Sequence, residues 1–142
     1  MCVDLNRCLY YSDANGEDFD AAKPLRRVLT VMDAIVAGEG EGPLAPRDAP
    51  VGAILAATDP VALDLVALRL MGFDEQKIPK IREPMANRKL RVTEVNSPDD
   101  VIVFEPDPRN NERRCRRLSD IRCERVFAAH PGWAGYIERG SA

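Results

Sequence analysis

Apolar residues gather in a few separate segments, and their spacing predicts both strands and helices. Residues 26–32 (RRVLTVM) and 51–57 (VGAILAA) are rich in β-branched and apolar side chains, which predicts two buried strands. The stretch between them, residues 38–50, predicts a long loop. Residues 91–95 and 101–104 predict two shorter strands joined by a turn.

The strongest single signal is for a helix over residues 61–71 (VALDLVALRLM). Asp59 can cap its N-terminus, and Pro60 suits the first helical position because the N–H that proline lacks would be unpaired there. Gly72 is a typical residue at a helix C-terminus. The helix is apolar nearly all round, apart from Asp64 and one arginine, so we expect it to be buried on more than one side.

Shorter helices are predicted over residues 5–11, with Asp4 as N-cap, and over residues 81–87. Strands and helices therefore mix along the chain. We expect an α/β fold with a mixed or mostly parallel sheet flanked by helices. At 142 residues, the chain predicts one domain over residues 1–142.

Composition and charge narrow the classes of partner. The chain is 45% hydrophobic and 30% charged, with a net charge of −3, which argues against a general nucleic-acid binder. Residues 107–125 form a local basic segment that we expect to be exposed. No run approaches the roughly 20 apolar residues of a membrane helix, and the first residues lack the apolar core of a signal peptide. These features predict a cytoplasmic protein without membrane contact.

The segment 31–64 is the most informative part of the chain for chemistry. Glycines alternate with glutamates in its middle: Gly38, Glu39, Gly40, Glu41 and Gly42. A phosphate loop combines glycines with a lysine, and two glutamates would repel a phosphate. The same carboxylates suit a hard cation such as Mg²⁺, Mn²⁺ or Ca²⁺, so Asp33, Glu39 and Glu41 are candidate metal ligands. The alternative is a solvated loop whose glycines serve turn geometry.

Three aspartates extend this candidate site. If the two main strands are parallel neighbours, Asp33 and Asp59 reach the same sheet edge as the glycine-rich loop. The predicted ligand-binding residues are then Asp33, Gly38, Gly40, Gly42, Asp59 and Asp64. Structural roles remain open for each aspartate: Asp59 as a helix cap, Asp33 as a cap or turn residue, and Asp64 paired with an arginine or a backbone amide, since a buried carboxylate needs a partner.

The cysteines and the single histidine add little chemistry. Cys2, Cys8, Cys115 and Cys123 do not have the spacing of common zinc or iron–sulfur sites. We expect free, reduced thiols; a four-cysteine site joining the chain ends is the alternative. His130 lies among apolar residues in HPGW and favours a structural role.

The motifs VMDAIVAGEGEGP and ATDPVALDLVALRLMGFDEQKIP closely resemble the uncharacterised DUF362 family, and VDLNRCLYY and HPGW are similar to the same family. The chain departs from the family pattern at Ala34 and Glu41. Family members are typically longer, so the resemblance implies that this chain corresponds to their C-terminal portion. Some members carry ferredoxin-like segments. This chain lacks the corresponding cysteine runs, so we expect no iron–sulfur cluster.

Two hypotheses follow. In the first, a DUF362-like domain binds a divalent cation or a small polar ligand at the acidic, glycine-rich site. Catalysis, if present, would be metal-assisted chemistry on a phosphorylated or carboxylated substrate. In the second, the chain is a non-catalytic interaction or assembly module, completed by a partner chain or as a homodimer through the helix at residues 61–71 and the aromatic tail. The sequence leaves the reaction and the substrate open.

Overall fold

The computed structural model describes residues 2–16, 23–86, 89–107, 109–110 and 112–140. Its helices and strands are α1 (Cys2–Tyr11), β1 (Thr30–Glu41), β2 (Ala45–Ala57), α2 (Pro60–Met71), α3 (Pro79–Ala86), β3 (Ile102–Pro106) and β4 (Arg113–Arg117). Short 3-10 helices lie at η1 (Glu75–Lys77), η2 (Pro98–Asp100) and η3 (Leu118–Asp120). The described strands form two antiparallel pairs, β1–β2 and β3–β4.

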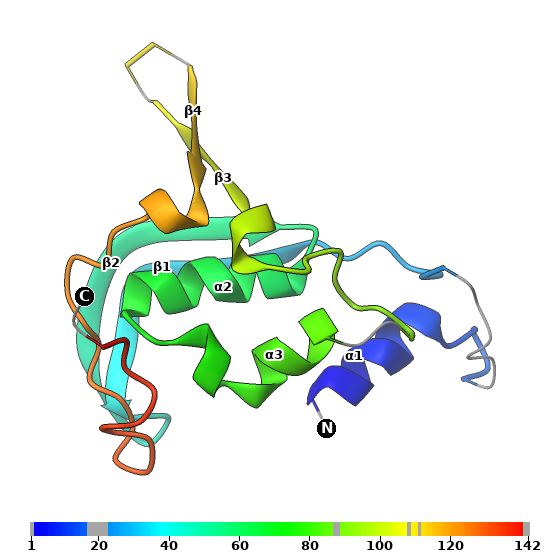
Figure 1. Cartoon of the computed structure of the whole chain (residues 1–142), viewed down its shortest axis with the longest axis horizontal. Helices are drawn as coiled ribbons and strands as arrows, with labels where there is room; N and C mark the ends of the chain where they lie inside the picture. Colours follow the sequence, from blue (N-terminus) through cyan, green and yellow to red (C-terminus); the bar gives the residue numbers. More distant parts are fainter. Residues whose placement is uncertain (1, 17–22, 87–88, 108, 111, 141–142) are drawn as a thin grey trace.

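Helix α2 lies at the centre of the fold, between the β1–β2 pair and α3 (Figure 1). Its buried side chains, among them Leu65 and Leu68, are part of the main hydrophobic core. Residues of α3 and of the C-terminal segment, residues 121–140, belong to the same core. The predicted ends are confirmed. Asp59 caps the N-terminus, and Gly72 ends the helix in the left-handed conformation with φ 74°.

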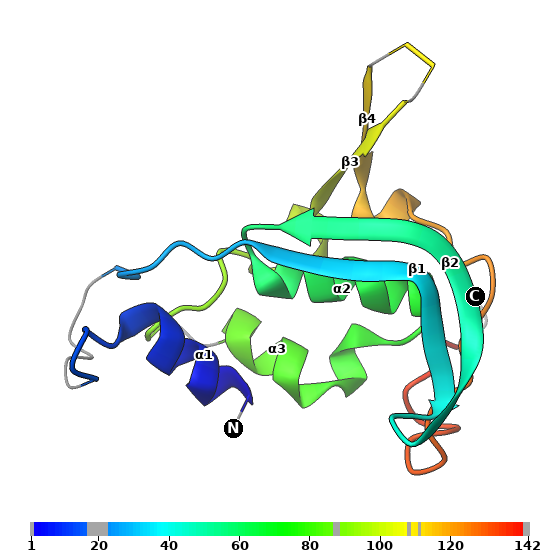
Figure 2. The same cartoon turned by 180° about the vertical axis from the view of Figure 1, so that it is seen from behind.

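Strands β1 and β2 form one long ribbon that bends over α2 and continues down beside the C-terminal segment (Figure 2). A three-residue turn at positions 42–44 joins them. Residues on the inner face, such as Val51 and Leu55, pack against the core. A register shift between Ala34 and Val36 interrupts the pairing, as expected where a strand bends.

The predicted α/β fold with a mixed or mostly parallel sheet is wrong. The expected loop at residues 38–50 is instead the distal half of the ribbon, paired from Gly38 with Asp48 to Glu41 with Ala45. Two strands joined by so short a turn must run antiparallel, because a parallel pair needs a long crossover. The strand predicted over residues 91–95 is also absent from the described structure.

Helices α1 and α3 lie side by side beyond α2, and the β3–β4 hairpin projects from the body (Figure 1). Helix α1 begins at Cys2, so Asp4 lies in its first turn and is not its N-cap. Helix α3 contains Pro84; its predicted last residue, 87, lies outside the described residues. In the basic segment 107–125, residues 108 and 111 lie outside them too. No described helix is both long and apolar enough to cross a membrane.

Candidate functional site

The acidic, glycine-rich segment is the distal half of the ribbon, and the C-terminal segment holds it in place. The backbone N–H of Ala128 donates to a carboxylate oxygen of Glu39 at 2.9 Å, and Gly40 N–H donates to the Ala128 carbonyl at 2.9 Å. Arg125 forms an ion pair with Glu39, whose side chain is only 9% exposed. The Ala128 hydrogen bond and the Arg125 guanidinium hold the pKa of Glu39 below its usual range. Glu39 is therefore an anchor between the ribbon and the C-terminal segment.

The structure does not bring the predicted ligand residues together. Gly38, Gly40 and Gly42 lie at or near the turn end of the ribbon, whereas Asp59 follows the opposite end. Asp33 lies between them on the exposed outer face of β1, opposite Ile54, and accepts a hydrogen bond from Ile35 N–H at 2.9 Å.

The divalent-cation site stays a prediction. Glu41 is exposed at the end of β1, away from Asp33. Among the residues that the structure describes, no three His, Cys, Asp or Glu side chains are grouped as a metal ion requires. The four cysteine side chains are free. His130 accepts a hydrogen bond from Gly132 N–H at 3.1 Å and lies exposed in a turn.

Asp59 has two structural connections. One carboxylate oxygen accepts from the N–H groups of Val61 and Ala62 at 3.0 and 3.1 Å, which is the predicted helix cap. The other accepts from the Thr93 hydroxyl at 2.8 Å and from Glu94 N–H at 2.9 Å. The sequence gives no sign of this second set of partners, because they lie more than 30 residues further along the chain.

Asp64 lines a cavity of about 650 Å³ between α2, the η1–α3 segment and the C-terminal segment. Its walls are mostly apolar and include Met32 from β1, Phe73, and Trp133 from the C-terminal segment. The charged side chains in the described lining are Asp64 and Lys80. This volume lies in the range of small-molecule sites in proteins.

The environment of Asp64 differs from that of the other acidic residues. Its side chain is part-buried, and it makes no hydrogen bond or ion pair with any residue of the described structure. Burial raises its pKa, and the charge of Lys80 only partly opposes that rise. The arginine or amide partner that the sequence left open is therefore not found among the described residues, and the cavity is where a ligand donor can reach it.

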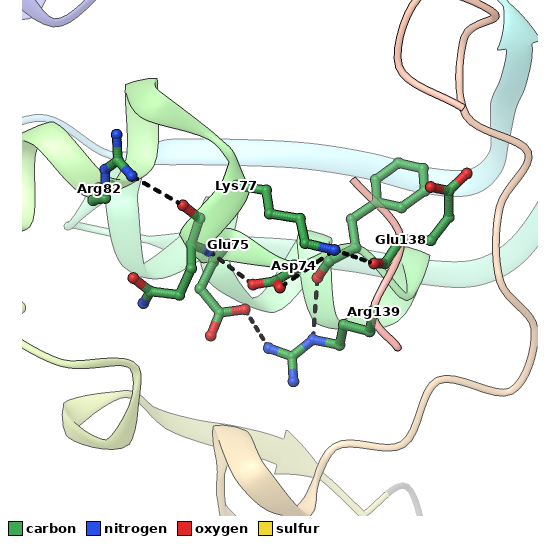
Figure 3. Close-up of polar contacts among 8 residues, drawn as sticks. Asp74, Glu75, Lys77, Arg82, Glu138 and Arg139 are labelled. Atoms are coloured by element: carbon green, nitrogen blue, oxygen red, sulfur yellow. Dashed lines mark hydrogen bonds and ion pairs between the residues drawn. The ribbon is translucent and has the colours of Figure 1, made fainter. Parts of the chain in front are cut away.

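A network of polar contacts fixes the wall of this cavity that carries Trp133 (Figure 3). Arg139 forms an ion pair with Glu75 and donates to the Phe73 carbonyl at 3.1 Å. Lys77 donates to the Glu138 carbonyl at 2.9 Å. We call residues 133–139 the C-terminal strap. No sequence motif links the η1 segment to the strap, so the sequence gives no sign of this network.

Comparison with known proteins gives one match. The family model DUF362, a domain of unknown function, matches residues 1–69. No curated protein and no solved structure matches the chain. The matched part holds α1, the β1–β2 ribbon and most of α2, whereas the FDEQKIP and HPGW motifs lie outside it. Whether the chain corresponds to the C-terminal portion of the family stays a prediction. Residues 1–69 match the DUF362 model, which is the family that the motifs in this part of the chain predicted.

Proposed function

We propose that this DUF362-type chain is an assembly module, in which the outer face of the β1–β2 ribbon packs against the same face of a second copy. One observation carries the proposal: aliphatic side chains on this face are in solvent. Val31 and Val36 are each 60% exposed, and Ile54 is 64% exposed. The ribbon that carries them lies on the outside of α2 (Figure 2).

The pattern along the ribbon supports burial on both faces. An antiparallel sheet with one face in water normally alternates apolar and polar residues. Here the inner face contacts the core, yet the outer face is also apolar. Across the described positions 31–36 and 50–56, Asp33 is the one charged side chain. Strands with two apolar faces are typical of sheets that are covered on both sides.

A second copy is a suitable occupant for this face. Identical aliphatic surfaces are complementary to one another, and a two-fold axis closes such a pair without further partners. Asp33 lies three residues from the start of β1. It lies opposite Ile54 on this face, so its carboxylate must keep contact with water when two copies pack together.

Light scattering after size-exclusion chromatography tests this proposal, with a pair of matched variants. Ile54→Lys replaces an exposed aliphatic side chain of the ribbon face with a longer charged one opposite Asp33, and we expect it to be monomeric where the unsubstituted chain is dimeric. Phe104→Lys on β3 is the control, because Phe104 is also 64% exposed but lies on the other hairpin. We expect this variant to remain dimeric.

Two results would contradict the proposal. One is a folded, monodisperse monomer at every concentration at which the unsubstituted chain stays soluble. The other is a dimer that Phe104→Lys dissociates and Ile54→Lys does not. Circular dichroism of both variants separates loss of assembly from loss of folding.

A further inference from the structure

The cavity beside Asp64 is a second site, separate from the outer face of the ribbon. Helix α2 forms one wall, the η1–α3 segment another, and the C-terminal strap a third. The pocket opens to solvent, has a volume of about 650 Å³ and is lined mostly by apolar side chains. Pockets of this size and character are typical of small-molecule sites in proteins.

Hydrogen bonds and an ion pair hold the strap in place as one wall of this cavity. Besides the Arg139 and Lys77 contacts, Asp74 N–H donates to the Ile137 carbonyl at 2.7 Å, and Phe73 pairs with Glu138 as an antiparallel bridge. These bonds hold the strap against the η1 segment (Figure 3). The strap carries Ile137 and Trp133, which line the cavity together with residues of α2. Such a scaffold positions the lining side chains before any ligand arrives, which reduces the entropy that binding costs.

We propose that this cavity binds a small molecule with an apolar body and a protonated amine, and that the carboxylate of Asp64 recognises the amine. This proposal does not rest on the assembly proposal. The apolar body would occupy the space between Leu68, Phe73 and Trp133, all of which line the cavity. The amine would supply the donors that Asp64 does not find among the described residues.

The charges of the cavity favour a cation over an anion. The carboxylate oxygens of Asp64 are not among the fully buried, unpartnered atoms of the described residues. A protonated amine that replaces water at this carboxylate would make a charge-assisted hydrogen bond beside apolar walls. The other charged lining residue, Lys80, is exposed. Water can therefore screen the Lys80 charge, whereas Asp64 is set among apolar side chains. An anionic ligand would place like charges together at the less exposed end of the site.

Binding can be followed by the fluorescence of Trp133, because it is the only tryptophan in the chain and lines the cavity. Three probes of similar shape are titrated against its fluorescence: 2-phenylethylamine, the neutral 2-phenylethanol, and the anion 3-phenylpropionate. We expect the amine to bind most tightly and saturably. Binding of the alcohol more tightly than the amine, or of the anion more tightly than the amine, would overturn the proposed ligand class.

Matched variants test whether Asp64 is the residue that recognises the amine. Asp64→Asn keeps the size of the side chain and removes its charge. We expect amine affinity to fall by about tenfold or more, in line with the loss of a charge-assisted hydrogen bond, while alcohol affinity stays nearly unchanged. Lys80→Gln should leave amine binding intact or strengthen it. Unchanged amine affinity in Asp64→Asn would refute the role of Asp64.

A third variant tests whether the probes bind inside the cavity. Ala67→Leu on α2 adds volume inside the cavity, so we expect it to weaken the amine and the alcohol together. Circular dichroism and the melting temperature establish that each variant is folded. If no probe changes the Trp133 signal of the folded, unsubstituted chain, or if Ala67→Leu binds the probes as well as that chain does, the site is refuted.

Discussion

The carboxylate of Asp59 accepts four hydrogen bonds in the fold, two at each oxygen. One pair caps α2, and the other ties Thr93 and Glu94 to the start of that helix. Both carboxylate oxygens of Asp59 therefore have hydrogen-bond partners within the fold. This arrangement argues for stability, and not ligand binding, as its role in the chain.

Replacing Asp59 should destabilise the chain measurably. We expect Asp59→Ala to lower the free energy of unfolding by about 1–3 kcal/mol, because the cap is lost and the Thr93 and Glu94 donors lose their acceptor. Asp59→Asn keeps one acceptor oxygen and should cost less. Urea unfolding measures both. A loss within about 0.5 kcal/mol for Asp59→Ala would contradict the structural role.

The raised pKa of Asp64 should make the free energy of unfolding depend on pH in the opposite direction to that expected for a paired carboxylate. Its pKa is raised by burial, so the folded chain keeps this proton at pH values where the unfolded chain has lost it. Its contribution to stability is therefore present below the ordinary value of 3.8 and is lost as pH rises through the raised pKa.

Urea unfolding over a pH series tests this dependence, with Asp64→Asn as the reference that cannot titrate. We expect the unfolding free energy of the unsubstituted chain, relative to Asp64→Asn, to fall as pH rises above 3.8 and then to level off. A constant difference between the two proteins, or one that grows in favour of the unsubstituted chain, would contradict the raised pKa.

The residue-scale predictions from sequence succeeded where the partners are close in the chain. The cap formed by Asp59 joins residues two and three positions away, so its signal is local. The same reasoning predicted that Asp64 needs a partner or a ligand. The main backbone partner of Glu39, Ala128, lies 89 residues away. No local pattern reports such a contact, so Glu39 resembled a free loop carboxylate.

At the scale of elements, α2 was predictable and the ribbon was not. Asp59, Pro60 and Gly72 mark the ends of α2 in the sequence itself. In the ribbon, glycines and prolines occupy strand positions that usually hold β-branched residues. Composition therefore predicted a loop at residues 38–50, although the alternation of glycine and glutamate has the two-residue period of a strand. The predicted parallel sheet is wrong because it required a long connection at residues 38–50, where the chain instead forms paired strands.

Gly72 allows a prediction that separates backbone strain from crowding. It has φ +74°, and a Cβ atom there would lie 2.9 Å from the Cys123 sulfur and 3.0 Å from Val126. Gly135 has a similar φ of +78°, but an added Cβ would meet nothing within 4 Å. Gly135→Ala therefore reports the strain alone, at about 1–2 kcal/mol.

We expect Gly72→Ala to cost clearly more than Gly135→Ala, by about 1–3 kcal/mol for the added crowding at the end of α2. Thermal or urea unfolding measures both losses. Equal losses in the two variants would mean that Cys123 and Val126 move aside freely. That result would contradict close packing of residues 123–126 against the helix end.

At the scale of the whole molecule, the last third of the chain supports the elements that precede it. Ala128 holds the ribbon at Glu39 and Gly40, and Phe127 N–H donates to the Met71 carbonyl at the end of α2. Arg139 then closes the strap onto Glu75. The DUF362 match ends at residue 69, before any of these supporting segments. The fold of the matched part thus depends on contacts from outside it.

This dependence predicts the effect of opening the strap. Arg139→Ala removes the partner of the largely buried Glu75 carboxylate, together with the bond to the Phe73 carbonyl. We expect a loss of stability of about 1–3 kcal/mol and greater quenching of Trp133 fluorescence by acrylamide, since the strap carries Trp133. Arg82→Ala is the control, because Arg82 makes an exposed contact of 3.5 Å to the Gln76 carbonyl, outside the strap. If Arg139→Ala leaves Trp133 as protected as Arg82→Ala does, the strap is held by its apolar contacts, and the polar network does not shape the cavity.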